Sequence, residues 1–400
     1  MRFGKIGGTV AVAAAGLLAA LAVPAQAQTV KVGVILTYSG PNAQPGLEVD
    51  KGIALYVKEH AKDLPPGVKL ELVRRDDQGA NPEIAKRLAQ ELVTRDHVQF
   101  LCGVIWSPNA IAIAPVATAA KVPFVIMNAS TASITRRSPY IVRVSWTVWQ
   151  DAYPLGTWAA KQGWKTAYTI VSDYAPGFDG EAAFTKAFTA AGGHIAGSLR
   201  VPLKNPDFVP FLQRIKDAKP DVAFNFNPGG KQSSAFMKAW RDVGLKDAKV
   251  ALVGTPDLVT DNELWNMGDE AKGVVTSGPY SIASTRPANK AFLAAWHRAY
   301  GQDSLPISAS VAAWDGMTAM YDVIKETKGK FTGDQAMAIL SHWRNPNSPR
   351  GLIAIDPKTR DIVQNIYIRR TQRVDGHLEN VEFETIPQVK DPWKELNPPK

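Results

Sequence analysis

From residue 28 onward, the chain alternates short apolar runs of the strand type with longer segments that have helical spacing. The run VKVGVILTYSG is followed by LEVDKGIALYVKEHAKDL, in which apolar residues recur at helical intervals from Val49 to Val57. The next strand pattern, VKLELVRRDDQ, precedes a helical segment that opens with Asn81 as its N-cap. Repeated strand–helix–strand order predicts an α/β fold in which a parallel sheet has helices on both faces.

A second series of the same kind begins near residue 165, with the strand pattern KTAYTIVSD and the helical pattern GEAAFTKAFTAAG. Two consecutive α/β series, each with its own core, predict two doubly wound parallel-sheet lobes. Between them, VRVSWTVWQDAY alternates apolar and polar residues, which is typical of a connecting strand. The chain ends in the Pro-rich segment IPQVKDPWKELNPPK, which predicts an irregular tail over residues 386–400.

The first 27 residues have the pattern of an export signal. MRFGK supplies two cations, GGTVAVAAAGLLAALAV is apolar, and PAQAQ places small residues at alternate positions. We expect cleavage after about Ala27 and an exported, soluble mature chain, with an uncleaved membrane anchor as the alternative. Loss of Arg2 and Lys5 lowers the formal net charge from +9 to +7, and no dense basic tract points to nucleic acid as a partner.

Functional residues are expected in the segments that follow the strands, because ligands of open parallel sheets bind at the carboxyl ends of the strands. The corresponding segments are rich in hydroxyl, amide and aromatic residues: 37–46, 105–110, 127–135, 172–180, 225–230 and 254–258. They contain no dinucleotide fingerprint, phosphate loop or nucleophile elbow, and none of the six histidines has metal-ligand spacing. Cys102 lies in an apolar run and is expected to be an inert core residue. We therefore expect binding rather than catalysis, with no catalytic residue, metal or cofactor.

The stretch GVIWSPNAIAIAP places Ser107 directly after an apolar strand and before a proline. A hydroxyl residue in this position is a good N-cap for the helix that follows. The same arrangement leaves backbone N–H groups and a hydroxyl at the strand end, where an anion can bind. From these residues alone, both interpretations of Ser107 remain open.

Three longer stretches carry a family resemblance: VKVGVILTYSGPNAQPGLEVDKGIALYVKE, DDQGANPEIAKRLAQELV and APVATAAKVPFVIMNAS. They resemble the leucine/isoleucine/valine-binding protein family, the type I periplasmic substrate-binding proteins of ABC importers. The resemblance extends over nearly the whole mature chain. It implies two lobes joined by a hinge that the chain crosses three times and that closes on a ligand. We expect lobe 1 to comprise residues 28–146 and 280–348, and lobe 2 to comprise residues 147–279 and 349–385.

The resemblance also implies where a ligand carboxylate binds. In this family, a hydroxyl residue at the end of the third strand and a small-residue turn after the fourth strand hold that group. Ser107 has the first position, and Ala129, Ser130 and Thr131 have the second. Tyr174 falls where the family places a tyrosine of the second lobe that covers the ligand.

In the second lobe the chain departs from the family pattern. Asn227 lies in a loop where relatives carry a Gly-Gly-Tyr type turn, and the aromatic residue is missing. Asp257 is displaced by one or two positions from the acidic residue that accepts a ligand ammonium in relatives, and capping of a helix near Leu258 is its alternative role. Trp106 and Tyr38 are candidates for apolar walls of the site, with core packing as the alternative for Trp106.

These features predict the periplasmic substrate-binding component of an ABC importer, which captures a small hydrophobic carboxylate and delivers it to a permease in the inner membrane. A benzoate or cinnamate derivative is favoured, because an α-amino acid brings an ammonium group that needs an acidic acceptor. A branched-chain or other hydrophobic amino acid, or an amide, is the alternative ligand. A ligand-sensing receptor domain and a hydrolase are further alternatives. We expect a monomer that binds no nucleic acid.

Overall fold

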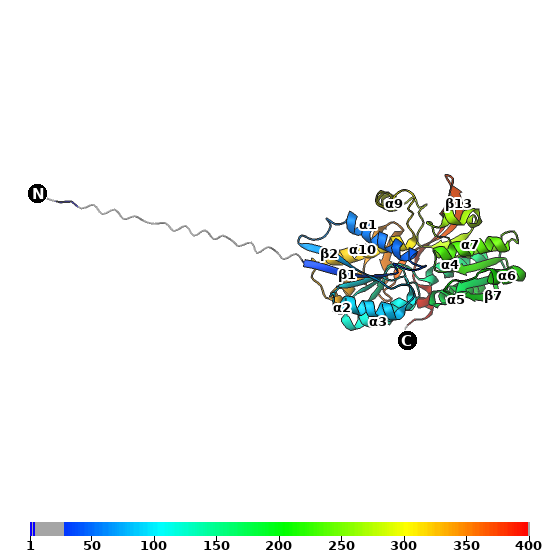
Figure 1. Ribbon diagram of the computed structural model, residues 1–400, viewed down its shortest axis with the longest axis horizontal. Coiled ribbons are helices and arrows are strands. Elements are labelled where there is room, and N and C mark those ends of the chain that lie inside the picture. The colour runs from blue at the N-terminus through cyan, green and yellow to red at the C-terminus, as the bar shows by residue number, and fades with distance from the viewer. Residues whose placement is uncertain (2, 5–27, 399–400) are drawn as a thin grey trace.

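The computed structural model describes residues 1, 3–4 and 28–398 and places two α/β lobes side by side (Figure 1). Most of the predicted signal segment, with its cleavage site after Ala27, lies outside the described residues. Among the helices that are described, none is long and apolar enough to cross a membrane.

The first lobe is built on five parallel strands in the order β2-β1-β3-β4-β5. They are β1 (Gln28–Leu36), β2 (Val68–Asp76), β3 (Phe100–Gly103), β4 (Phe124–Ile126) and β5 (Ile141–Arg143). The helices around this sheet are α1 (Gln44–Glu59), α2 (Pro82–Thr94), α3 (Ser107–Ala120), α9 (Pro287–Tyr300), α10 (Ser308–Thr327) and α11 (Gly333–Leu340). Helices α1 and α10 pack together on one face, and α2 and α3 pack together on the other (Figure 1). The predicted parallel sheet with helices on both faces is confirmed here.

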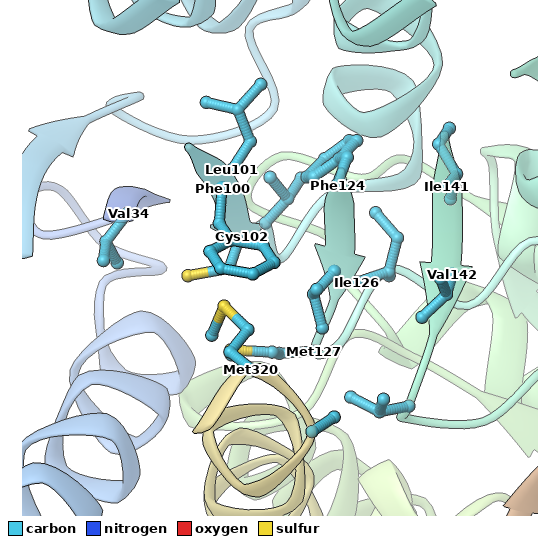
Figure 2. Close-up of a cluster of buried hydrophobic side chains, with 14 of the residues drawn as sticks. Val34, Phe100, Leu101, Cys102, Phe124, Ile126, Met127, Ile141, Val142 and Met320 are labelled. Carbon is cyan, nitrogen blue, oxygen red and sulfur yellow. The ribbon is translucent and has the colours of Figure 1, made fainter. Parts of the chain in front are cut away.

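Strands β3, β4 and β5 are buried along their whole length, which explains why their sequences are apolar without alternation. Figure 2 shows their side chains on both sides of the sheet, with Cys102 facing Met320 of α10 on one side and Leu101, Phe124 and Ile141 on the other. Cys102 is fully buried in this cluster, and burial raises the pKa of its thiol. The interpretation of Cys102 as a core residue is confirmed.

The second lobe contains a sheet of nine strands, eight of them in the order β11-β12-β13-β10-β9-β8-β6-β7, with β14 paired to β13. Its five parallel strands are β6 (Thr166–Ser172), β7 (His194–Val201), β8 (Val222–Phe226), β9 (Ala251–Gly254) and β10 (Val275–Gly278). Four antiparallel strands complete it: β11 (Arg344–Ser348), β12 (Gly351–Ile355), β13 (Ile362–Val374) and β14 (His377–Val389). The longer helices of this lobe are α4 (Val148–Lys161), α5 (Ala175–Ala190), α6 (Val209–Ala218) and α7 (Lys231–Val243). The second sheet is therefore mixed rather than wholly parallel.

The chain passes between the two sheets three times: between β5 and α4, between β10 and α9, and between α11 and β11. Three expectations need correction. Residues 344–348, expected in lobe 1, pair with β12 and so belong to the second sheet. The second half of the expected connecting strand is the start of α4, because the Thr147 hydroxyl accepts the Gln150 N–H at 3.1 Å and caps a helix. The expected irregular tail contains the end of β14 and the short helix α12 (Pro392–Leu396).

Candidate functional site

A cavity lies between the two lobes and is lined from the carboxyl ends of strands in both sheets. Trp106 follows β3, Ser130 follows β4, Tyr174 follows β6 and Asp257 follows β9, and all four line this cavity. Ligands of parallel sheets bind at such strand ends.

Three aromatic rings follow one another along the cavity wall. The ring centroids of Trp106 and Tyr174 are 6.3 Å apart, and those of Tyr174 and Phe226 are 6.0 Å apart. The Trp106 indole N–H donates to the Thr37 hydroxyl oxygen at 2.9 Å, which fixes the orientation of that ring. Trp106 is only 2% exposed, and its side chain packs into the core of the first lobe as well as lining the cavity. The wall offers flat apolar surface to a ligand.

The turn after β4 and the start of α3 lie together in the first lobe. The Thr131 N–H donates to the Ser107 hydroxyl oxygen at 3.1 Å. Buried Arg143 donates to the carbonyls of Ala129 and Thr131, at 3.2 and 2.9 Å, and its Nε lies 2.7 Å from Asp361. Arg143 therefore fixes the orientation of the Ala129 and Thr131 carbonyls, which point toward its guanidinium group. Ser130 lines the cavity, whereas Ser107, Ala129 and Thr131 do not.

Ser107 is not the N-cap of α3. Trp106 has that position, and no side-chain cap hydrogen bond is formed there. Ser107 is the first helical residue, and its hydroxyl oxygen accepts from the neighbouring turn. The Ser107 hydroxyl can therefore still donate its own proton to an acceptor near the N-terminus of α3, where negative charge is favoured.

Asn227 and Tyr38, like Ser107, Ala129 and Thr131, are expected site residues that do not line the cavity. The Asn227 side chain accepts from the Gly229 N–H at 3.1 Å and from the Ser233 hydroxyl at 2.8 Å. It therefore shapes the turn over residues 228–230, whose backbone reaches the cavity. The Tyr38 hydroxyl instead donates to Asp50 at 3.1 Å.

Asp257 is the acidic group of the cavity. It lies in a 3-10 turn (Pro256–Val259) whose N-cap, Thr255, makes no side-chain cap hydrogen bond, so Asp257 caps no helix. No hydrogen bond to its carboxylate is formed by the described residues. Burial raises the pKa of Asp257 to about 7, although the Arg369 guanidinium lowers it.

Three further groups in or near the cavity were not foreseen from the sequence. Asp151 of α4 is fully buried, and neither of its carboxyl oxygens has a partner among the described residues. Burial, together with the charge of Asp257, raises the pKa of Asp151 well above its ordinary value. Arg369 of β13 lies close enough to both carboxyls to influence them. Trp146, which follows β5, lines the cavity and has an indole N–H with no partner in the described chain.

The sequence signals of these groups are weak but present. Asp151 interrupts an apolar helical face, where burial of a charge is costly, and Arg369 directly follows the apolar run IYI of its strand. The described residues contain no group of three or more His, Cys, Asp or Glu side chains placed to hold a metal ion. Two lobes that enclose an aromatic cavity with different polar groups on each side define a two-lobe substrate-binding protein.

Comparison with known proteins agrees with this class. Residues 29–376 match the family described as periplasmic binding protein, and the chain belongs to that family. The "Leu/Ile/Val-binding protein homolog 6" of Brucella abortus (strain 2308) is 39% identical over 386 residues, which is 96% of this chain and 98% of that one.

Two solved structures are similar over almost the whole described chain. A solute binding protein of an ABC transporter from Rhodopseudomonas palustris BisB5, in complex with 3,4-dihydroxy benzoic acid, is 47% identical with a TM-score of 0.88. A second from R. palustris, in complex with 4-hydroxybenzoate, is 42% identical with the same TM-score. Both matches cover 92% of this chain and 99% of the other. The chain is thus a solute-binding protein of the ABC-transporter type.

Proposed function

We propose that this protein captures a hydroxybenzoate, an aromatic carboxylate with a ring hydroxyl, and delivers it to an ABC permease in the inner membrane. The observation that carries the proposal is the distribution of polar groups around the aromatic wall. Hydroxyl and N–H donors lie on the side of the first lobe, and the carboxyl of Asp257 lies on the side of the second. A ligand that bridges the lobes therefore needs an acceptor at one end and a donor at the other.

The ligand carboxylate is expected on the side of the first lobe. Ser130 and the unpartnered indole N–H of Trp146 line the cavity there. The Ser107 hydroxyl proton and the N-terminus of α3 lie behind Ser130, where they favour an anion. Hydrogen bonds to a charged acceptor are stronger than neutral ones, so this side fixes the orientation of the ligand.

The ring hydroxyl is expected at Asp257, whose carboxylate has no donor among the described residues. An α-amino acid fits this side less well, because its ammonium needs a fully ionised partner once the lobes close. Arg369 already places positive charge near Asp257, which disfavours a second cation at this position. The ligands bound by the two R. palustris proteins support the same class.

A thermal-shift screen tests the proposal against its alternative, a branched-chain or other hydrophobic amino acid. Hydroxybenzoates should raise the melting temperature more than benzoate, and leucine, isoleucine and valine should leave it unchanged. Hydroxycinnamates in the same screen report whether the cavity accepts a longer acid. Stabilisation by the aliphatic amino acids alone would overturn the proposal and would make Asp257 an ammonium acceptor.

We also propose that the chain is exported with cleavage after about Ala27, acts as a monomer and releases its ligand unchanged. The N-terminal sequence of the secreted protein tests the cleavage, and light scattering after gel filtration tests the monomer. Mass analysis of the recovered ligand tests the third point, since a product in stoichiometric amount would indicate an enzyme.

A further inference from the structure

A groove between the two lobes lies beside the cavity that we assign to the ligand. Trp106 lines both spaces, so its side chain forms part of the wall between them. The first lobe also lines the groove from within segments 37–42 and 78–81, and the second lobe lines it from within 203–208 and 231–235. The groove opens to solvent, because several of its lining residues are exposed: Ser39, Pro41, Gln78, Lys204, Asn205 and Lys231. We call it the outer groove.

The lobes meet along a seam between the outer groove and the cavity. In the first lobe, Asn42 lines the groove and Gln44 lines the cavity. In the second lobe, Lys231 lines the groove and Gly230 lines the cavity. Across the seam, a Cβ atom at Gly230 would lie 3.1 Å from Oε1 of Gln44, so the lobes are in close contact there. Separation of the lobes breaks this contact and joins the two spaces.

The charged residues that line the outer groove are both cations. Lys204 follows β7 and Lys231 begins α7, and neither side chain forms an ion pair within the described part of the chain. Asp76 and Asp77 precede the lining residue Gln78 but do not line the groove themselves. The Asp76 carboxylate accepts the Gln78 N–H at 2.9 Å, and Asp77 is fully buried. A groove with this lining attracts anions.

We propose that the outer groove is where an anionic ligand first meets the protein, and that the ligand enters the cavity from there through the seam between Gln44 and Gly230. The inference rests on the proposed function, because it needs a ligand with net negative charge. A hydroxybenzoate has one, whereas a hydrophobic α-amino acid is a zwitterion with no net charge at neutral pH. Lys204 and Lys231 line the groove but not the cavity, so they contact the ligand only in transit.

Groups that act only in transit leave a distinct kinetic signature. The ligand passes the two lysines on its way in and on its way out, and it does not contact them once it is bound. Removal of both charges should therefore slow association and dissociation by the same factor and leave the dissociation constant unchanged. Two unit charges at about 10 Å in water give about three- to fourfold at low ionic strength. The effect should vanish near 1 M salt, where the Debye length is about 3 Å.

Stopped-flow binding of 4-hydroxybenzoate to the full mature chain tests the route in the double variant Lys204→Gln/Lys231→Gln. Trp106 and Trp146 line the cavity, so tryptophan fluorescence reports the arrival of the ligand. At about 10 mM ionic strength, where the Debye length is about 30 Å, the variant should associate and dissociate about three- to fourfold more slowly than the parent protein. Near 1 M salt the two proteins should have the same rates.

A second double variant controls for net charge. Lys165→Gln/Lys249→Gln also removes two exposed lysines of the second lobe. These residues lie just before β6 and β9, at the opposite end of the second sheet from the cavity. Because this variant has the same net charge as the first one, it removes the same overall attraction for an anion. It should keep the rates of the parent protein.

The outcomes separate the entry route from the proposed function. If no hydroxybenzoate binds to the parent protein, the proposed function fails and the route fails with it. If 4-hydroxybenzoate binds but the Lys204/Lys231 variant is slowed no more than the control, the inference is wrong and the proposed function stands. A slower association with an unchanged dissociation rate would also contradict the route, because the lysines would then attract the bound ligand as strongly as the entering one.

Discussion

Binding of 4-hydroxybenzoate is expected to strengthen as the pH rises from about 5 to about 8, because its phenol donates to the ionised form of Asp257. The pKa of Asp257 is raised from 3.8 to about 7, mainly by burial, while Arg369 opposes the rise. Donation from the phenol favours the ionised form, so the bound ligand lowers this pKa. Affinity is therefore lost as the pH falls through about 7.

The size of the effect follows from the hydrogen bond that is changed. A bond to a charged acceptor contributes about 1–1.5 kcal/mol more than a bond to a neutral one. That difference corresponds to about one pKa unit, or about tenfold in the dissociation constant. The loss should level off near pH 5, where Asp257 is protonated in both the free and the bound protein. Asp151, Asp261 and Arg369 surround Asp257 and can shift the midpoint of the transition.

Calorimetric titrations across this pH range measure the effect, with benzoate as the matched ligand. Benzoate lacks the phenol, so any pH response that it shows comes from other groups of the protein. One such group is Asp179, which accepts the Ala132 N–H and whose pKa burial raises to about 6. The difference between the two ligands should disappear in Asp257→Asn. Equal pH slopes for the two ligands in the parent protein, or an unchanged difference in the variant, would refute the reasoning.

Three more predictions test the carboxylate side, the lobe contact and the hinge. Ser107→Ala should weaken hydroxybenzoate binding by roughly 1.5–3 kcal/mol in calorimetry, with a smaller effect on ligand-free stability; equal affinity would leave Ser107 no role in binding. Asp179 of the second lobe accepts the Ala132 N–H of the first at 2.9 Å, so Asp179→Ala should increase the radius of gyration of the ligand-free protein in small-angle scattering. Arg350 and Asp315 form a fully buried ion pair at 2.9 Å, so Arg350→Met should lower the free energy of unfolding by about 3–5 kcal/mol in chemical denaturation, and a loss below about 1 kcal/mol would contradict this.

The lobes were predictable because their central strands are buried along their whole length, while their helices are buried on one face only. The prediction was wrong for one segment whose apolar pattern fits a helix as well as a strand. The segment VRVSWTVWQDAY alternates like a strand, yet Thr147 begins a helix in the middle of it, because a local cap outweighs a short period-two pattern. The second sheet looked wholly parallel because its antiparallel strands, β11 to β14, come from the end of the chain, after the regular alternation has stopped.

The site was predictable where it depends on strand ends, and Trp106, Ser130, Tyr174 and Asp257 line one cavity. Tyr38 did not reach that cavity, because its hydroxyl bonds to Asp50 on α1 instead. Groups around Asp257 that come from distant parts of the chain could not be assigned from local pattern. Asp151, Asp257 and Arg369 come close together only because α4 packs against both β9 and β13 in the second lobe.

The most direct test of the proposed ligand is a crystal structure of the protein with 4-hydroxybenzoate. The account predicts the carboxylate within hydrogen-bond distance of Ser107 or Ser130, the ring against Trp106 and Tyr174, and the phenol oxygen within hydrogen-bond distance of the Asp257 carboxyl. A ligand bound in the opposite direction, or outside the cavity between the lobes, would contradict it.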